Sequence, residues 1–147
     1  METTTITSVK NIPISPNTKL EEILRVFDAQ QKNRQNVKNC TSKERKAKLK
    51  KLLDTTLEYR SKIEAATFAD LRKPAIETDF TEVYSVVAEI KHAIANLDDW
   101  MAGHEVDTPL VLIGSSSKIV YECKGVTLLM TPWNYPFQMP VQHLVAA

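Results

Sequence analysis

The sequence predicts an α/β chain in which a layer of helices comes first and short β-strands follow. Apolar residues recur at helical spacing up to about residue 102, and from residue 110 onward they form short runs and alternating patterns instead. The chain has 147 residues, 43% of them hydrophobic and 25% charged. This composition is typical of a globular protein with a core of its own and argues against disorder throughout.

Charge and composition exclude several classes of protein. The net charge of +1 argues against a strongly basic nucleic-acid binder. No run approaches the roughly 20 apolar residues that a membrane span needs, and the first residues do not form a secretory signal. Cys40 and Cys123 lie far apart and have no metal-binding spacing, so we expect no metal site. Two lone thiols favour a reducing, cytoplasmic location.

Residues 1–17, which are rich in threonine, are interpreted as an N-terminal arm. Three helices are predicted after it, at about 18–38, 42–72 and 79–102. Each opens with a polar cap residue followed three places later by glutamate, a pattern in which each side chain bonds the other residue's backbone N–H. The three pairs are Thr18–Glu21, Thr41–Glu44 and Asp79–Glu82.

The third predicted helix has the cleanest apolar stripe, formed by Val83, Val86, Val87, Ile90, Ile94, Leu97 and Met101. Pro74 is expected to separate it from the second helix, because proline cannot continue the helical hydrogen bonds. Gly103 is expected to end it in a left-handed conformation.

Three β-strands are predicted at about 110–113, 118–123 and 126–130. The last is apolar throughout, which is typical of a strand buried on both faces of a parallel sheet. Residues 138–147 resemble the start of a further helix.

Charge is unevenly spread, with a net +8 over residues 32–62 and a net −7 over residues 64–107. We interpret this as two solvated helix faces of opposite sign that attract one another. The alternative is a non-catalytic helical module whose basic helix binds RNA or another anionic partner. The basic stretch lacks the interleaved aromatic residues of a single-strand binder.

The most informative stretch is GVTLLMTPWNYPF, from Gly125 to Phe137. It reads as a turn, a buried strand and a loop entering a helix, and such loops bind ligands at the carboxyl ends of parallel strands. The helix start would supply free N–H groups for an anion or a developing oxyanion, and Asn134 adds a side-chain donor. Trp133 and Tyr135 offer flat surfaces to a ligand. Alternatively, these aromatics belong to the core, or the segment is a proline-rich ligand for another protein.

This stretch resembles the first cofactor-domain strand and following loop of the aldehyde dehydrogenase superfamily. The PWNYPF form is most similar to the class 3 branch, which acts on fatty and aromatic aldehydes. The preceding KIVYECKG resembles the family's strand before the motif, with Cys123 where proline is usual. The segment DLRKP, at residues 70–74, stands where the family often has D-x-G-K-P. The resemblance covers about residues 18–147.

The resemblance implies an NAD(P)-dependent enzyme that oxidises small-molecule aldehydes to carboxylic acids through a cysteine thiohemiacetal and a thioester. The chain would hold the helical layer and the first strands of an NAD(P)-binding domain. Asn134 would be the catalytic oxyanion donor, and Thr131, Pro132 and Trp133 would bind NAD or NADP. Tyr135 would lie near the aldehyde pocket, and the full-length enzyme would be a homo-oligomer without nucleic acid or a membrane span.

The family's catalytic cysteine, its general-base glutamate and its Lys-Pro-Ser-Glu-type cofactor motif all lie downstream of the PWN segment. None of them is present in these 147 residues, and neither Cys40 nor Cys123 has the context of the nucleophile. We therefore expect this chain to be an amino-terminal part of a longer enzyme, and to be inactive and marginally stable alone.

Overall fold

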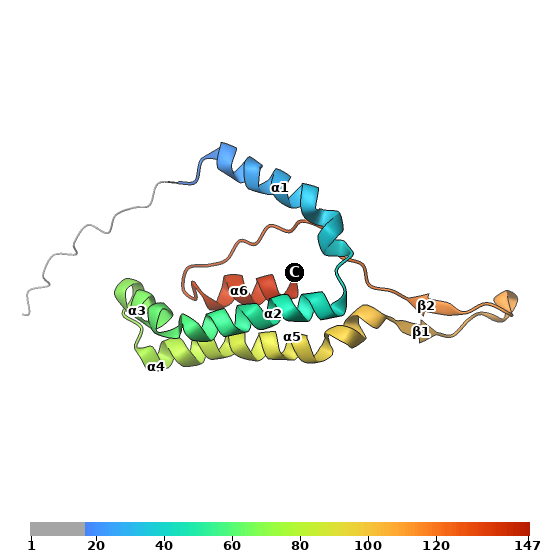
Figure 1. Cartoon of the computed structure of the whole chain (residues 1–147). Coiled ribbons are helices and arrows are strands. Elements are labelled where there is room, and N and C mark those ends of the chain that lie inside the picture. Colours follow the sequence, from blue (N-terminus) through green and yellow to red (C-terminus); the bar gives the residue numbers. More distant parts are fainter. Residues whose placement is uncertain (1–16) are drawn as a thin grey trace, which may run out of the picture.

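The structure, a computed structural model, describes residues 17–147 (Figure 1). These residues form six α-helices, two short strands, one π-helical turn and one 3-10 turn. In chain order they are α1 (Leu20–Lys38), α2 (Ser42–Glu58), α3 (Arg60–Leu71), α4 (Ala75–Thr78), the π-helical turn η1 (Asp79–Val83), α5 (Tyr84–Ala102), β1 (His104–Val106), the 3-10 turn η2 (Leu110–Leu112), β2 (Ser117–Ile119) and α6 (Gln138–Ala146). The predicted arm lies, apart from residue 17, outside the described residues.

Helix α5 is the centre of the fold. It packs against α2 and against α6, whereas α1 crosses above them and the β1–β2 hairpin projects beyond one end (Figure 1). Among residues 17–147, the buried apolar side chains all come from this helix and the turn before it: Val83, Val86, Val87, Ile90 and Ala93. The core therefore forms on the stripe that the sequence predicts for the third helix.

Helix α1 occupies all but the first two residues of the predicted helix 18–38, but its predicted cap is wrong. Lys19 stands at the N-cap position without a side-chain hydrogen bond. The residue three places later is then Glu22 rather than Glu21, and its carboxylate bonds Arg25 at 2.6 and 2.7 Å. Thr18 consequently lies one residue too early to cap the helix.

The predicted cap at Thr41 is present. The Thr41 hydroxyl accepts from the Glu44 N–H at 3.3 Å, and the Glu44 carboxylate accepts from the Thr41 N–H at 2.7 Å. The Thr41 hydroxyl also donates to this carboxylate at 2.8 Å, and the hydrogen bonds from the Thr41 backbone and side chain lower the pKa of Glu44. The predicted helix 42–72 is interrupted at Tyr59, which separates α2 from α3.

Replacing Thr41 with alanine should lower the free energy of unfolding by about 0.5–2 kcal/mol, because it removes a cap from α2. Thermal unfolding followed by circular dichroism measures the change. Thr18→Ala is the matched control, since Thr18 stands outside its helix, and it should have little effect. Equal effects of the two substitutions would contradict the assignment.

The third predicted helix begins earlier than residue 79, so the predicted cap by Asp79 and Glu82 is wrong. Helical structure starts at Ala75, directly after Pro74, and continues through η1 into α5. Asp79 therefore has helical dihedral angles and lies inside the helix. Pro74 fits the start because a first turn does not need its missing N–H. Asp79 and Glu82 form ion pairs instead.

Asp79 pairs with Arg60, which joins the start of α3 to η1. The Arg60 Nε–Asp79 Oδ1 distance is 2.7 Å, and hydrogen bonding to Arg60 holds the pKa of Asp79 below its usual 3.8.

The lowered pKa of Asp79 makes the stability of the fold depend on pH. A carboxyl group with a lowered folded-state pKa stabilises the fold above its unfolded pKa and loses this contribution as the pH falls through the folded pKa. Thermal unfolding between pH 6 and about 2 should show this loss below about pH 4, and Arg60→Met should reduce it. If the variant lost the same amount of thermal stability at low pH as the unmodified chain, the prediction would be contradicted.

Charges of opposite sign meet where α2 packs on α5. Lys46 Nζ lies 2.5 Å from Asp98 Oδ2, and the Ser42 hydroxyl donates to the same carboxylate. These contacts lower the pKa of Asp98, the hydrogen bond from Lys46 having the larger effect. The contacts favour the interpretation of attracting helix faces.

Helix α5 ends at Gly103, as predicted, with a positive φ of 68°. Its ψ of −175° is extended rather than left-handed helical, and it turns the chain into β1. A side-chain Cβ at this position would overlap the carbonyl oxygen of Ile119. Glycine therefore allows β1 and β2 to pair antiparallel, with His104 opposite Ile119.

The strand predictions are mostly wrong. In the predicted strand 110–113, residues 110–112 form the 3-10 turn η2, closed by a hydrogen bond from the Leu112 N–H to the Pro109 oxygen. Only 118–119 of the predicted strand 118–123 pair with a neighbour, and 126–130 form no strand. A strand requires a partner, and residues 17–147 offer none to the apolar run 126–130. Sequence reasoning does not predict β1, because Val106 is the one apolar residue among its three and the strand is too short to show an alternating pattern.

Candidate functional site around Asn134

The five predicted site residues lie on one loop that leads into α6. The 3.2 Å hydrogen bond from the Met139 N–H to the Tyr135 oxygen marks the start of the helical turns. Thr131 and Tyr135 are half-buried, whereas the other predicted site residues are exposed, Trp133 to 85%. Their adjacency in sequence alone would bring these residues together, so the informative contacts are those made with distant elements.

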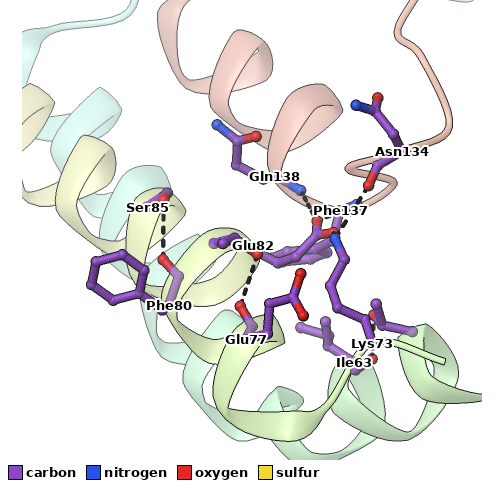
Figure 2. A network of polar contacts seen from close by, with 11 residues as sticks. Ile63, Lys73, Glu77, Phe80, Glu82, Ser85, Asn134, Phe137 and Gln138 are labelled. Atoms are coloured by element: carbon purple, nitrogen blue, oxygen red, sulfur yellow. Dashed lines mark hydrogen bonds and ion pairs between the residues drawn. The ribbon is translucent and has the colours of Figure 1, made fainter. Parts of the chain in front are cut away.

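Lys73 contacts the backbone of this loop (Figure 2). Its ammonium group donates to the backbone oxygen of Asn134 at 3.2 Å and lies 4.3 Å from the centroid of the Tyr135 ring. The same group donates to Glu82 at 2.8 Å, and only 9% of the Lys73 side chain is exposed. Lys73 follows Arg72, whose left-handed φ of 58° ends α3 and turns the chain.

Glu82 holds the start of α6 with its second oxygen. The Phe137 and Gln138 N–H groups donate to Oε2 at 3.1 and 2.8 Å, and the residue is fully buried. A carboxylate at a helix start satisfies free N–H groups and suits the positive end of the helix dipole. The prediction that this helix start offers these N–H groups to a ligand is therefore wrong, because the protein's own carboxylate occupies two of them.

Sequence reasoning missed the roles of Lys73 and Glu82. The signal for Glu82 is its spacing: it stands four residues before Val86 and eight before Ile90, on the buried face of one continuous helical segment. A lone acidic residue in an apolar stripe indicates a buried partner. Lys73, in the loop segment DLRKP, is that partner.

The Asn134 side chain points away from the network that binds its backbone (Figure 2). Within residues 17–147 its amide forms no hydrogen bond, and the residue is exposed. A neutral NH₂ donor on a fixed backbone is suited to stabilising negative charge that develops on a bound molecule. Lys73 and Glu82 thus hold the backbone of this loop by hydrogen bonds, and the Asn134 side-chain amide remains free to donate.

The described residues contain neither a metal-binding cluster nor a membrane-spanning helix. Residues 17–147 contain no group of three or more histidine, cysteine or acidic side chains placed to bind a metal ion. Among the helices of that range, none combines the length and apolar character needed to cross a bilayer. Cys40 is half-buried and Cys123 is exposed, and neither forms a disulfide.

Comparison with known proteins gives a consistent result. Residues 4–147 match the aldehyde dehydrogenase family. The chain is 39% identical to the 4,4'-diaponeurosporen-aldehyde dehydrogenase of Staphylococcus aureus and 36% identical to aldehyde dehydrogenase family 3 member H1 of Arabidopsis thaliana. Each alignment covers 70% of this chain, and 22% and 21% of those proteins.

A solved structure supports the same relationship. The substrate-bound state of Staphylococcus aureus AldH superimposes with a TM-score of 0.80 at 33% identity, over 84% of this chain and 27% of that one. The predicted class of fold, a helix-rich amino-terminal α/β region, is thereby confirmed. The chain spans between about a sixth and a third of the length of the relatives that it matches.

Proposed function

Because this chain belongs to the aldehyde dehydrogenase family, we propose that it forms the amino-terminal part of an enzyme that oxidises aldehydes to carboxylic acids with NAD or NADP. The observation that carries the proposal is the loop at Asn134, whose backbone is held by buried groups while its amide stays free. In this proposal the cysteine nucleophile and the glutamate base come from the part of the enzyme beyond these 147 residues.

Asn134 serves as the oxyanion donor in this mechanism. When the cysteine thiolate attacks the aldehyde carbon, negative charge develops on the carbonyl oxygen, and the Asn134 NH₂ group donates a hydrogen bond to it. The amide is neutral, so it stabilises the charge without altering the protonation of the nucleophile. Tyr135 lies next in the chain and borders the aldehyde pocket, while Lys73 covers one face of its ring.

The loop fits a flat cofactor ring better than it fits a phosphate. Trp133 exposes most of its indole, and Pro132 beside it is also exposed. The first N–H groups of α6 are occupied by Glu82, so they do not bind a pyrophosphate. Thr131, Pro132 and Trp133 would therefore hold the nicotinamide end of NAD or NADP, which supplies the hydride acceptor when bound.

The purified 147-residue chain is expected not to reduce NAD or NADP when an aldehyde is supplied, because it lacks the nucleophile. The complete enzyme should reduce the cofactor, and it should keep its turnover when Cys40 and Cys123 are both replaced with serine. Absorbance of the reduced cofactor at 340 nm measures both. Turnover by the isolated chain, or its loss in the double variant, would contradict the proposed division of roles.

A further inference from the structure

We infer that Lys73 and Glu82 are positioning residues for Asn134, which fix the backbone at its carbonyl group and in the residues that follow it. This inference rests on the proposed role of Asn134 as oxyanion donor. Neither residue reaches the reacting atoms in this account, and both act through the loop.

Lys73 fixes the Asn134 peptide itself. An ammonium group has three N–H donors. One bonds the Asn134 oxygen at 3.2 Å and another bonds Glu82 at 2.8 Å, while the charge faces the Tyr135 ring at 4.3 Å. The peptide that follows the Asn134 Cα is thereby tied to the loop after α3.

Glu82 fixes the chain three and four residues further on. Its Oε1 atom accepts from Lys73 and its Oε2 atom accepts from the Phe137 and Gln138 N–H groups. All of the loop groups that form these hydrogen bonds, at residues 134, 137 and 138, are backbone atoms. The network therefore sets the position of the backbone and leaves the Asn134 amide free.

A contribution to stability does not by itself explain why the buried Lys73–Glu82 ion pair is present. A buried ion pair often stabilises a fold no more than apolar side chains of the same volume would. Directional hydrogen bonds to three backbone groups add a fixed geometry, and a donor displaced by about 1 Å can cost on the order of 10²-fold in rate. This requirement explains the charged pair beneath the loop.

Glu82→Gln is the sharpest test in the complete enzyme. An amide of the same shape accepts through only one of its two terminal atoms, so it must lose either Lys73 or the two N–H groups. We expect kcat to fall about 10- to 100-fold with little change in KM for the aldehyde. Lys46→Met, which breaks the ion pair between α2 and α5, is the control and should leave kcat unchanged.

The double variant Glu82→Gln/Asn134→Ala separates an effect on the position of Asn134 from a general loss of folded structure. If Glu82 acts only through Asn134, then Glu82→Gln should lower kcat less than about twofold further in an Asn134→Ala background. A loss as large as in the wild-type background, or an effect on kcat no larger than that of Lys46→Met, would overturn the inference.

Amide hydrogen exchange in the 147-residue chain keeps the inference testable without catalysis. The Phe137 and Gln138 amides should exchange at least tenfold faster in Glu82→Gln than in the unmodified chain, and Lys46→Met should not change them. Unchanged protection would overturn the inference. A failure of the proposed function would show differently, as an Asn134→Ala enzyme with normal turnover and normal loop protection.

Discussion

Asn134→Ala in the complete enzyme is expected to lower turnover by about 10²–10³-fold, while the affinity for NAD or NADP changes little. The physical reason is that the amide contributes only as charge develops on the aldehyde oxygen, so its loss affects the transition state and not cofactor binding. The backbone of Asn134 is held by Lys73 rather than by its own side chain, so the truncation leaves the loop in place. A chemistry-limited steady-state assay measures the change.

Two further variants sharpen this test. Asn134→Asp keeps the shape but replaces a donor with an acceptor, so its loss of turnover should be at least as large. Asn96→Ala is the control, because the half-buried Asn96 side chain bonds only His92, one turn earlier on α5. Normal turnover in both Asn134 variants would contradict the role of Asn134.

Lys73→Met should lower the free energy of unfolding by about 3–5 kcal/mol, the cost typical of leaving one charge of a buried pair without its partner. The Glu82 side chain is fully buried and the Lys73 side chain nearly so, which leaves little water to replace the lost ammonium group. Circular dichroism of the 147-residue chain measures the effect, as a lower urea midpoint or as loss of the helical signal without denaturant.

Lys46→Met provides the comparison for this stability test as well. It also removes a lysine from an ion pair between helices, but two-thirds of the Asp98 side chain is exposed to water. Its effect should therefore be much smaller, because solvent screens an exposed pair. If the two substitutions lowered the free energy of unfolding equally, the burial of the Lys73–Glu82 pair would not explain its effect on stability.

The helices could be predicted from sequence because their signals are local. The apolar stripe from Val83 to Ala93 marks the core, and the Thr41–Glu44 cap marks the start of α2. The same cap pattern misled at Asp79 because helical structure had already begun after Pro74. A capping pattern therefore identifies a helix start only where the preceding residues are not themselves helical.

The strands and the support of the loop could not be predicted in the same way, because both depend on distant partners. The run at 126–130 is apolar, yet it forms no strand because residues 17–147 supply no neighbour for it. The motif at 131–137 indicated where a site lies. It did not indicate that Glu82, 52 residues before Asn134, would occupy the start of α6. Such contacts depend on how α5 packs against α6.

The proposed mechanism requires a cysteine nucleophile encoded in the same reading frame as Asn134. Determining the nucleotide sequence of the transcript beyond the Ala147 codon tests this requirement most directly. We expect the frame to continue into a segment like Lys-Pro-Ser-Glu and then into a cysteine motif with its glutamate base. A stop codon immediately after Ala147 would contradict the assignment of Asn134 as the oxyanion donor of an active aldehyde dehydrogenase.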